Sequence, residues 1–235
     1  MGMDTQHRPT GRPRDATVAA VAEETPLERL ANAVTHGAGA GLAVAGLVLL
    51  VIAAAWTGSV AAILSVVVYG ASLIFLFLSS ALYHSLAHNE RVGALFEAFD
   101  HVGIFLLIAG TYTPFTLIAL PGWQGWFLFG AIWALAIGGI VMRLVWIRYL
   151  HPVFIVIYVI MGWLGVMFGG PIGDTIGPQG IDLLLIGGLF YTIGLVFFAW
   201  RKLPFNHMVW HLFVLAGSIF HFFAIFYYVV PTAAY

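Results

Sequence analysis

The sequence contains no cysteine and few charged residues, and each shortage excludes a class of protein. Without cysteine among its 235 residues, the chain can form no disulfide, thiolate metal site or thiol nucleophile. Only 8% of the residues are charged, whereas a soluble domain carries about 25%. The hydrophobic share is 62% and the mean hydropathy is +1.00. Such a chain cannot cover a water-facing surface with polar groups, so we expect lipid to be its main solvent.

The formal net charge is only −1, so there is no basic excess that would attract a nucleic acid, and none is expected as a partner. Residues 1–24 differ from the rest of the chain because they hold arginine, proline, glycine and threonine without an apolar run. That composition is typical of a disordered segment. The sequence therefore predicts a disordered cytoplasmic tail over residues 1–24 and one transmembrane domain over residues 25–235.

Apolar stretches of membrane length recur through residues 25–235. A bilayer core about 30 Å thick requires roughly 20 helical residues, and Thr57-Gly58 and Pro121-Gly122 interrupt the longest runs. The fold class predicted is all-α, a bundle of seven transmembrane helices. A capping box at Thr25-Pro26-Leu27-Glu28 begins a short amphipathic helix at about 25–36, which either lies at the interface or extends the first span. The predicted spans are about 37–57, 59–83, 101–120, 122–142, 152–170, 183–200 and 207–230.

Basic residues mark one side of this predicted bundle. All nine Lys and Arg residues fall before the first span or in the loops that follow the second, fourth and sixth spans. Cytoplasmic segments of membrane proteins carry such an excess. We therefore expect a multi-pass protein of the cell inner (plasma) membrane, with its N-terminus in the cytoplasm and its C-terminus outside. A wrong number of helices would scatter the basic residues over both sides.

Polar residues gather at the cytoplasmic end of the predicted helices. Ser80 and His84 lie one turn apart where the second span ends, and Asp100 directly precedes the third. His207 and His211 share one face at the start of the last span. By the topology above, His84, Asp100, His207 and His211 lie at the same depth although they are distant in sequence. Polar groups inside a membrane are costly and usually functional.

Three imidazoles at one depth favour a zinc site. Zinc accepts neutral histidine ligands, and a catalytic site keeps three protein ligands and an open position for water. His84, His207 and His211 are the predicted metal ligands, while Asp100 and Ser80 are the predicted catalytic residues that would hold the bound water. A pair of histidines at a helix end also occurs without a metal, simply within the headgroup layer. Iron or manganese stays an alternative, although three imidazoles suit zinc better than magnesium or calcium.

His221 is the histidine that this arrangement leaves over. It lies ten residues after His211, roughly 15 Å deeper along a helix, so we predict that it cannot join the same ion. It is expected to face the bundle interior, as a core histidine or as part of a proton or substrate path.

In combination, these motifs resemble the bacterial hemolysin III proteins, which belong with the progestin and adipoQ receptors, including the adiponectin receptors, and more distantly with the alkaline ceramidases of the CREST superfamily. The resemblance covers about residues 25–230. It rests on Glu28, Asn32, Thr35 and His36, then Ser80 and His84, then Asp100, and finally His207 and His211.

The resemblance implies zinc held at the positions of His84, His207 and His211, with Asp100 and Ser80 supporting the bound water. It also implies an intramembrane hydrolase acting on lipid amides such as ceramide, so membrane lipids are the expected partners. The leading hypothesis is a zinc-dependent hydrolase of a lipid amide or ester bond. Two alternatives stay open, namely a pore-forming cytolysin and a membrane-homeostasis sensor with structural zinc. An open metal position beside a lipid-sized cavity would favour the enzyme, a closed site of four ligands the sensor, and a continuous wet channel the pore.

Overall fold

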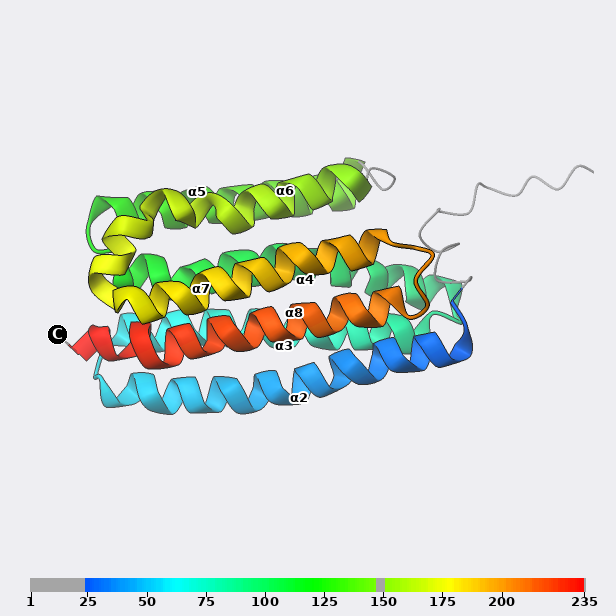
Figure 1. Cartoon of the computed structure of the whole chain (residues 1–235), viewed down its shortest axis with the longest axis horizontal. Coiled ribbons are helices and arrows are strands. Elements are labelled where there is room, and N and C mark those ends of the chain that lie inside the picture. Colours follow the sequence, from blue (N-terminus) through cyan, green and yellow to red (C-terminus); the bar gives the residue numbers. More distant parts are fainter. Residues whose placement is uncertain (1–23, 147–150, 235) are drawn as a thin grey trace, which may run out of the picture.

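The computed structural model describes residues 24–146 and 151–234, and every regular element in those ranges is helical (Figure 1). The tail predicted over residues 1–24 lies outside the described residues, apart from Glu24. The main helices are α2 (Pro26–Trp56), α3 (Val60–Leu86), α4 (Glu90–Pro114), α5 (Trp123–Val141), α6 (His151–Trp163), α7 (Gly169–Ala199) and α8 (Asn206–Ala224). Short π and 3-10 segments continue them at η1 (Phe115–Ala119), η2 (Met142–Trp146), η3 (Leu164–Phe168), η4 (Ile225–Val229) and η5 (Val230–Ala234).

Within the described ranges, six helices are long and apolar enough to cross a membrane, one fewer than the sequence predicts. The difference lies in residues 153–199, which form one apolar helical stretch of 47 residues. The sequence predicts a loop at about 171–182, but α7 is helical through that region except at Gly177 (φ 72°). Glycine adopts this left-handed conformation without strain, and Pro178 is suited to begin the helix that follows.

The start of α2 follows the predicted capping box. The Thr25 hydroxyl accepts a hydrogen bond from the Glu28 backbone N–H at 3.2 Å, and a Glu28 carboxylate oxygen accepts one from the Thr25 N–H at 2.9 Å. Pro26 occupies the first helical position. The helix then runs without a break to Trp56, so the segment at about 25–36 extends the first span rather than forming a separate helix.

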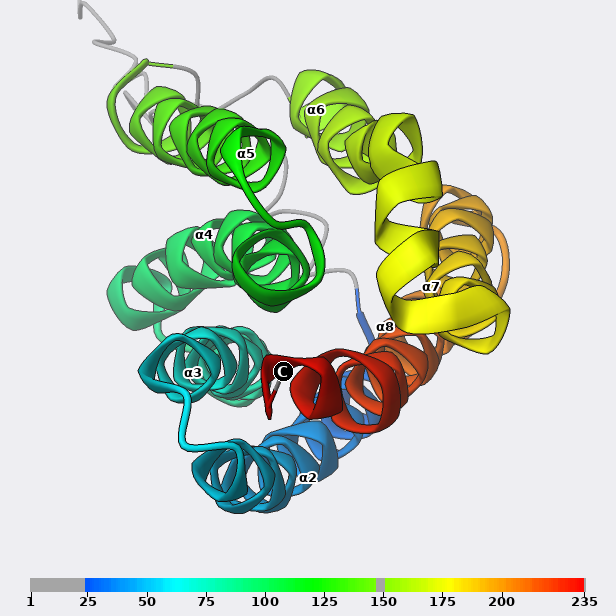
Figure 2. The same ribbon diagram turned by 90° about the vertical axis from the view of Figure 1, so that its left-hand side faces the viewer.

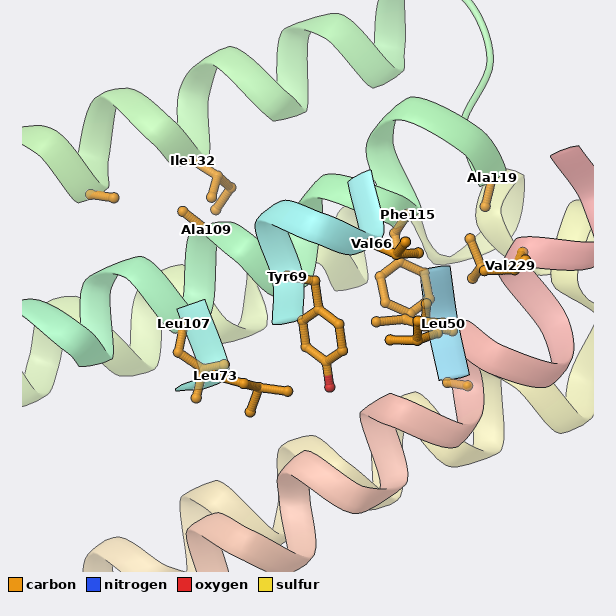
Figure 3. Packing of buried hydrophobic residues seen from close by; sticks show 14 of the residues in the cluster. Leu50, Val66, Tyr69, Leu73, Leu107, Ala109, Phe115, Ala119, Ile132 and Val229 are labelled. Carbon is orange, nitrogen blue, oxygen red and sulfur yellow. The ribbon is translucent and has the colours of Figure 1, made fainter. Parts of the chain in front are cut away.

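The helices surround the bundle axis in chain order, and α8 returns beside α2 (Figure 2). Helix α3 packs against both α2 and α4, while α7 packs against α8. The apolar core lies where these helices meet, and Leu50, Val66, Tyr69 and Phe115 are among its fully or nearly fully buried residues (Figure 3). The outer faces stay apolar as well, since large side chains such as Ile52 are exposed. An apolar exterior is what a bilayer requires of a helical bundle.

Close packing of α3 on α4 depends on Gly103. A methyl group built at Gly103 would lie 2.9 Å from the Leu76 Cα atom, which belongs to the backbone of α3. We predict that Gly103→Ala lowers the free energy of unfolding by about 1–3 kcal/mol, the usual cost of overpacking. Thermal unfolding in detergent should show a lower midpoint. Gly130→Ala in α5 is the matched control because nothing lies within 4 Å of its added methyl group. Equal midpoints for both variants would contradict the prediction.

Candidate metal centre

Three histidines from two helices meet at one end of the bundle. His84 lies in the last turn of α3, and His207 and His211 lie in the first turns of α8. One ring nitrogen of each histidine lies within 4.8 Å of those of the other two. The ring centroids are 4.7 Å apart for His84 and His207, 5.1 Å for His84 and His211, and 4.7 Å for His207 and His211. The predicted ligand set therefore comes together around one point.

A hydrogen bond to α2 places the first turn of α8 beside the start of α2. The second Glu28 carboxylate oxygen accepts the backbone N–H of Phe205 at 3.0 Å, directly before α8 begins. The capping residue of α2 thus also holds the start of α8. This contact brings His207 and His211 to the first part of α2, where Thr35 and His36 lie about two turns beyond Glu28.

Thr35 and His36 fix the ring of His211. The Thr35 hydroxyl donates to the backbone carbonyls of Ala31 and Asn32, each at 2.9 Å, so its oxygen is left to accept from His211 Nδ1 at 3.3 Å. A proton on Nδ1 leaves the Nε2 lone pair of His211 free to bind a metal. The His36 ring stacks on His211 with centroids 3.4 Å apart. Sequence reasoning gave His36 no individual role, although it belongs to the motif that carries the family resemblance.

The burial of His84 tests whether a metal fits these residues. The residue is 2% exposed, and apart from the Glu24 carboxylate 3.5 Å from Nδ1, neither of its ring nitrogens has a hydrogen-bond partner among the described residues. An unsatisfied buried polar group costs about 1–3 kcal/mol. A divalent ion held by three imidazoles would satisfy His84 and suits the donor set of His84, His207 and His211. The residues present therefore fit a metal ion.

Asp100 and Ser80 lie beside the histidines. Ser80 is fully buried on α3, one turn before His84. The Asp100 side chain on α4 interacts with both Ser80 and His207. Glu97, the other carboxylate that could compete for a catalytic role, instead pairs with Arg143 at 3.2 Å, and both of these side chains are buried. Of the two carboxylates, only Asp100 lines the cavity next to the histidines.

A cavity of about 940 Å³ opens beside the histidine cluster. Binding sites for small molecules usually occupy about 300–1,000 Å³. Its lining runs from Asp100 and His207 past apolar residues of α4, α6 and α7 to His221. His221 stays apart from the metal cluster, as predicted, with Nε2 lying 3.1 Å from the Leu184 carbonyl oxygen. The cavity is therefore large enough for a lipid chain and has a polar group at each end.

Glu24 is a site residue that sequence reasoning missed. Its carboxylate lies 3.5 Å from His84 Nδ1 and 3.3 Å from His207 Nδ1, and Asn32 Nδ2 donates to it at 3.2 Å. Burial acts to raise the pKa of Glu24, but its interactions with His207 and His84 outweigh burial and lower the pKa to about 2. The group is thus an anion at neutral pH. The signal in the sequence was its position directly before the capping box. A residue there is held close to the start of α2, which lies beside the histidines.

The chain is similar in sequence to known proteins over the region that contains this site. Residues 26–222 match the family described as haemolysin-III related. The chain is 47% identical to Hemolysin-3 of Bacillus cereus, over 88% of this chain and 94% of that protein. It is 42% identical to the Hemolysin-3 homolog of Bacillus subtilis (strain 168), over 86% of this chain and 95% of the relative. The monocyte to macrophage differentiation factor of Homo sapiens is 31% identical over 68% of each chain. The matched region contains the three histidines, Ser80 and Asp100.

We predict one metal ion per chain, bound by the histidine cluster. His84→Ala or His211→Ala should weaken binding by more than the roughly 10–100-fold that groups orienting a ligand contribute, because each removes a ligand. Zinc per chain, measured by atomic emission after dialysis of the purified protein, checks this. His221→Ala is the control, and it should keep the metal because His221 lies at the other end of the cavity. Full zinc occupancy in a His207→Ala, His211→Ala double variant would refute the assignment.

Proposed function

Because this chain belongs to the haemolysin-III-related family, we propose that it is a zinc-dependent membrane hydrolase that cleaves an amide or ester bond in a lipid. The observation that carries the proposal is the convergence of three histidine nitrogens within 4.8 Å of one another. Two of these histidines, His207 and His211, line a cavity of about 940 Å³ together with Asp100. A metal site with an adjoining cavity for a lipid chain is the arrangement that a lipid hydrolase requires.

The proposed roles divide between holding the metal and moving a proton. His84, His207 and His211 hold zinc, which when bound polarises a carbonyl oxygen and lowers the pKa of water. Asp100 positions the attacking water and accepts its proton on a carboxylate oxygen. The water oxygen bonds to the carbonyl carbon, the bond to the amine or alcohol breaks, and Asp100 returns the proton to that leaving group. The Ser80 hydroxyl, which lies close enough to influence Asp100, would hold its carboxylate in place.

The cavity supports a lipid as the substrate. Between Asp100 and His221 its lining is mostly apolar, with Ile104, Ile108 and Leu195 among the lining residues. Such a lining excludes water and packs against an acyl chain, while the polar groups at the metal end would bind the amide or ester. The cleaved bond would then lie at the end of the cavity that His207 and Asp100 line.

We also propose seven membrane crossings, with the N-terminus in the cytoplasm and the protein in the plasma membrane. The apolar stretch Val153–Ala199 has 47 residues, and a straight helix of that length would measure about 70 Å, over twice a bilayer core. Figure 1 shows α6 and α7 running along the long axis of the bundle and joined at one end. Two crossings in this stretch support a total of seven, and all nine basic residues then fall on one side.

A second candidate is a membrane-homeostasis sensor in which the metal is structural. The approach of the Glu24 carboxylate to 3.3 Å from His207 favours it, because a fourth protein ligand closes a metal site. The two functions differ in whether water reaches the ion.

Exchanging Asp100 for asparagine tests the hydrolase. Asp100→Asn keeps the shape of the side chain and removes the base, so turnover of a lipid amide or ester should fall by roughly 10²–10⁴-fold, while zinc stays bound. Glu90→Gln, an exposed position at the start of the same helix, is the charge-matched control and should keep full activity. A broad lipid screen in which zinc-loaded wild-type protein hydrolyses nothing would overturn the enzyme in favour of the sensor.

Reporter fusions test the topology. Reporters that are active only in the cytoplasm should work when fused near residue 10 or within the Arg201-Lys202 loop, because these segments carry basic residues. A reporter that is active only outside should work at Tyr235. A cytoplasmic Tyr235 would mean an even number of crossings and would contradict the proposed count of seven.

A further inference from the structure

The Glu24 carboxylate contacts two of the three clustered histidines at once. Oε1 lies 3.3 Å from His207 Nδ1 and Oε2 lies 3.5 Å from His84 Nδ1. Asn32, which is 1% exposed on α2, donates to Oε2 from Nδ2 at 3.2 Å. A carboxylate in this position either accepts hydrogen bonds from the two rings or binds the same ion as they do.

The distances favour a shared ion. N–H···O hydrogen bonds measure about 2.7–3.2 Å, so both contacts are long for that interaction. Apart from this contact with Glu24, His84 Nδ1 has no hydrogen-bond partner within the described part of the chain. In a tetrahedral zinc site with bonds of 2.0–2.1 Å, neighbouring ligand atoms are about 3.3 Å apart. The carboxylate thus lies at the separation that two ligands of one ion would have.

The position of Glu24 relative to the cavity also favours a metal ligand. Glu24 lines the cavity together with Asp100, His207 and His211. A carboxylate that only oriented the imidazoles would lie behind the rings, on the side away from the metal and the substrate space. Glu24 instead lines the cavity itself.

We propose that Glu24 is a fourth, exchangeable metal ligand that closes the site against water. It is exchangeable because it precedes the N-cap residue of α2 and because, among the described residues, its contacts besides the two histidines reduce to one hydrogen bond from Asn32. Glu24 lies outside the region that matches the family, which begins at residue 26. The inference depends on the part of the proposed function that places a metal ion at the three histidines. It does not depend on the protein being a hydrolase.

Cobalt reports directly on an open position. The full-length protein in detergent is loaded with Co²⁺, and its visible spectrum is followed as azide, a small anion that binds open metal positions, is added. Wild-type protein should resist azide because Glu24 occupies the position. Glu24→Gln should bind azide at least about tenfold more tightly and should lose Co²⁺ affinity by about 100-fold or more in a chelator competition, beyond the usual contribution of an orienting group. Glu90→Gln, with the same loss of charge, should behave as wild type.

Other outcomes of the azide and cobalt experiments would contradict the proposal. Equal azide affinity in wild type and Glu24→Gln would overturn the ligand assignment and leave Glu24 orienting the imidazoles, while the proposed hydrolase would stand. A wild-type protein that binds no Co²⁺ or Zn²⁺ would overturn both this inference and the proposed function. Glu24→Asp guards against misfolding, because it keeps a carboxylate. If its thermal unfolding matches that of Glu24→Gln, partial recovery of azide resistance in Glu24→Asp supports ligation, and the absence of recovery counts against it.

Discussion

The contact between the starts of α2 and α8 determines where the histidines lie. Glu28 caps α2 through Thr25 and accepts the Phe205 N–H with its other oxygen. One carboxylate that serves both helix starts ties them together. The same end of α2 then presents Thr35 to His211. The packing of α8 on α2 and the hydrogen bond from the Tyr69 hydroxyl on α3 to the Ser218 carbonyl oxygen on α8 hold the histidine pair of α8 near His84 as well.

The helix α4 shows how two carboxylates three residues apart acquire different roles. Glu97 and Asp100 are separated by about 60° around the helix. That rotation directs Glu97 towards α5, where it pairs with Arg143 at 3.2 Å, and directs Asp100 towards the cavity. A buried ion pair loses much of its Coulomb gain to desolvation, but removing one partner leaves the other charge uncompensated. Arg143 therefore commits Glu97 to the α4–α5 interface and leaves Asp100 as the carboxylate of α4 beside the histidines.

The sequence predicted those features that depend on periodicity, capping and charge. The capping box at Thr25 and Glu28 is local, and the shared depth of His84, Asp100, His207 and His211 follows from helix ends and the side marked by basic residues. Other features depend on tertiary contacts that no local pattern encodes. The helical course of α7 through Pro171 and Asp174 is one, since proline and glycine there resemble a loop until the neighbouring helices are in place. Glu24 is another. The sequence around it resembles the tail, whereas its contacts are with His84 on α3 and His207 on α8.

Glu24 and Asp100 give the site two carboxylates with opposed consequences. Both line the cavity next to His207, but they come from different elements, one directly before α2 and one on α4. Water beside the ion would be activated by Asp100 and displaced by Glu24. The proposed metal centre would have a closed state, with Glu24 on the ion, and an open state, in which Glu24 has moved away and Asp100 faces water. Hydrolase and sensor are then distinguished by how much of the time the chain spends in each state, since the same three histidines serve both.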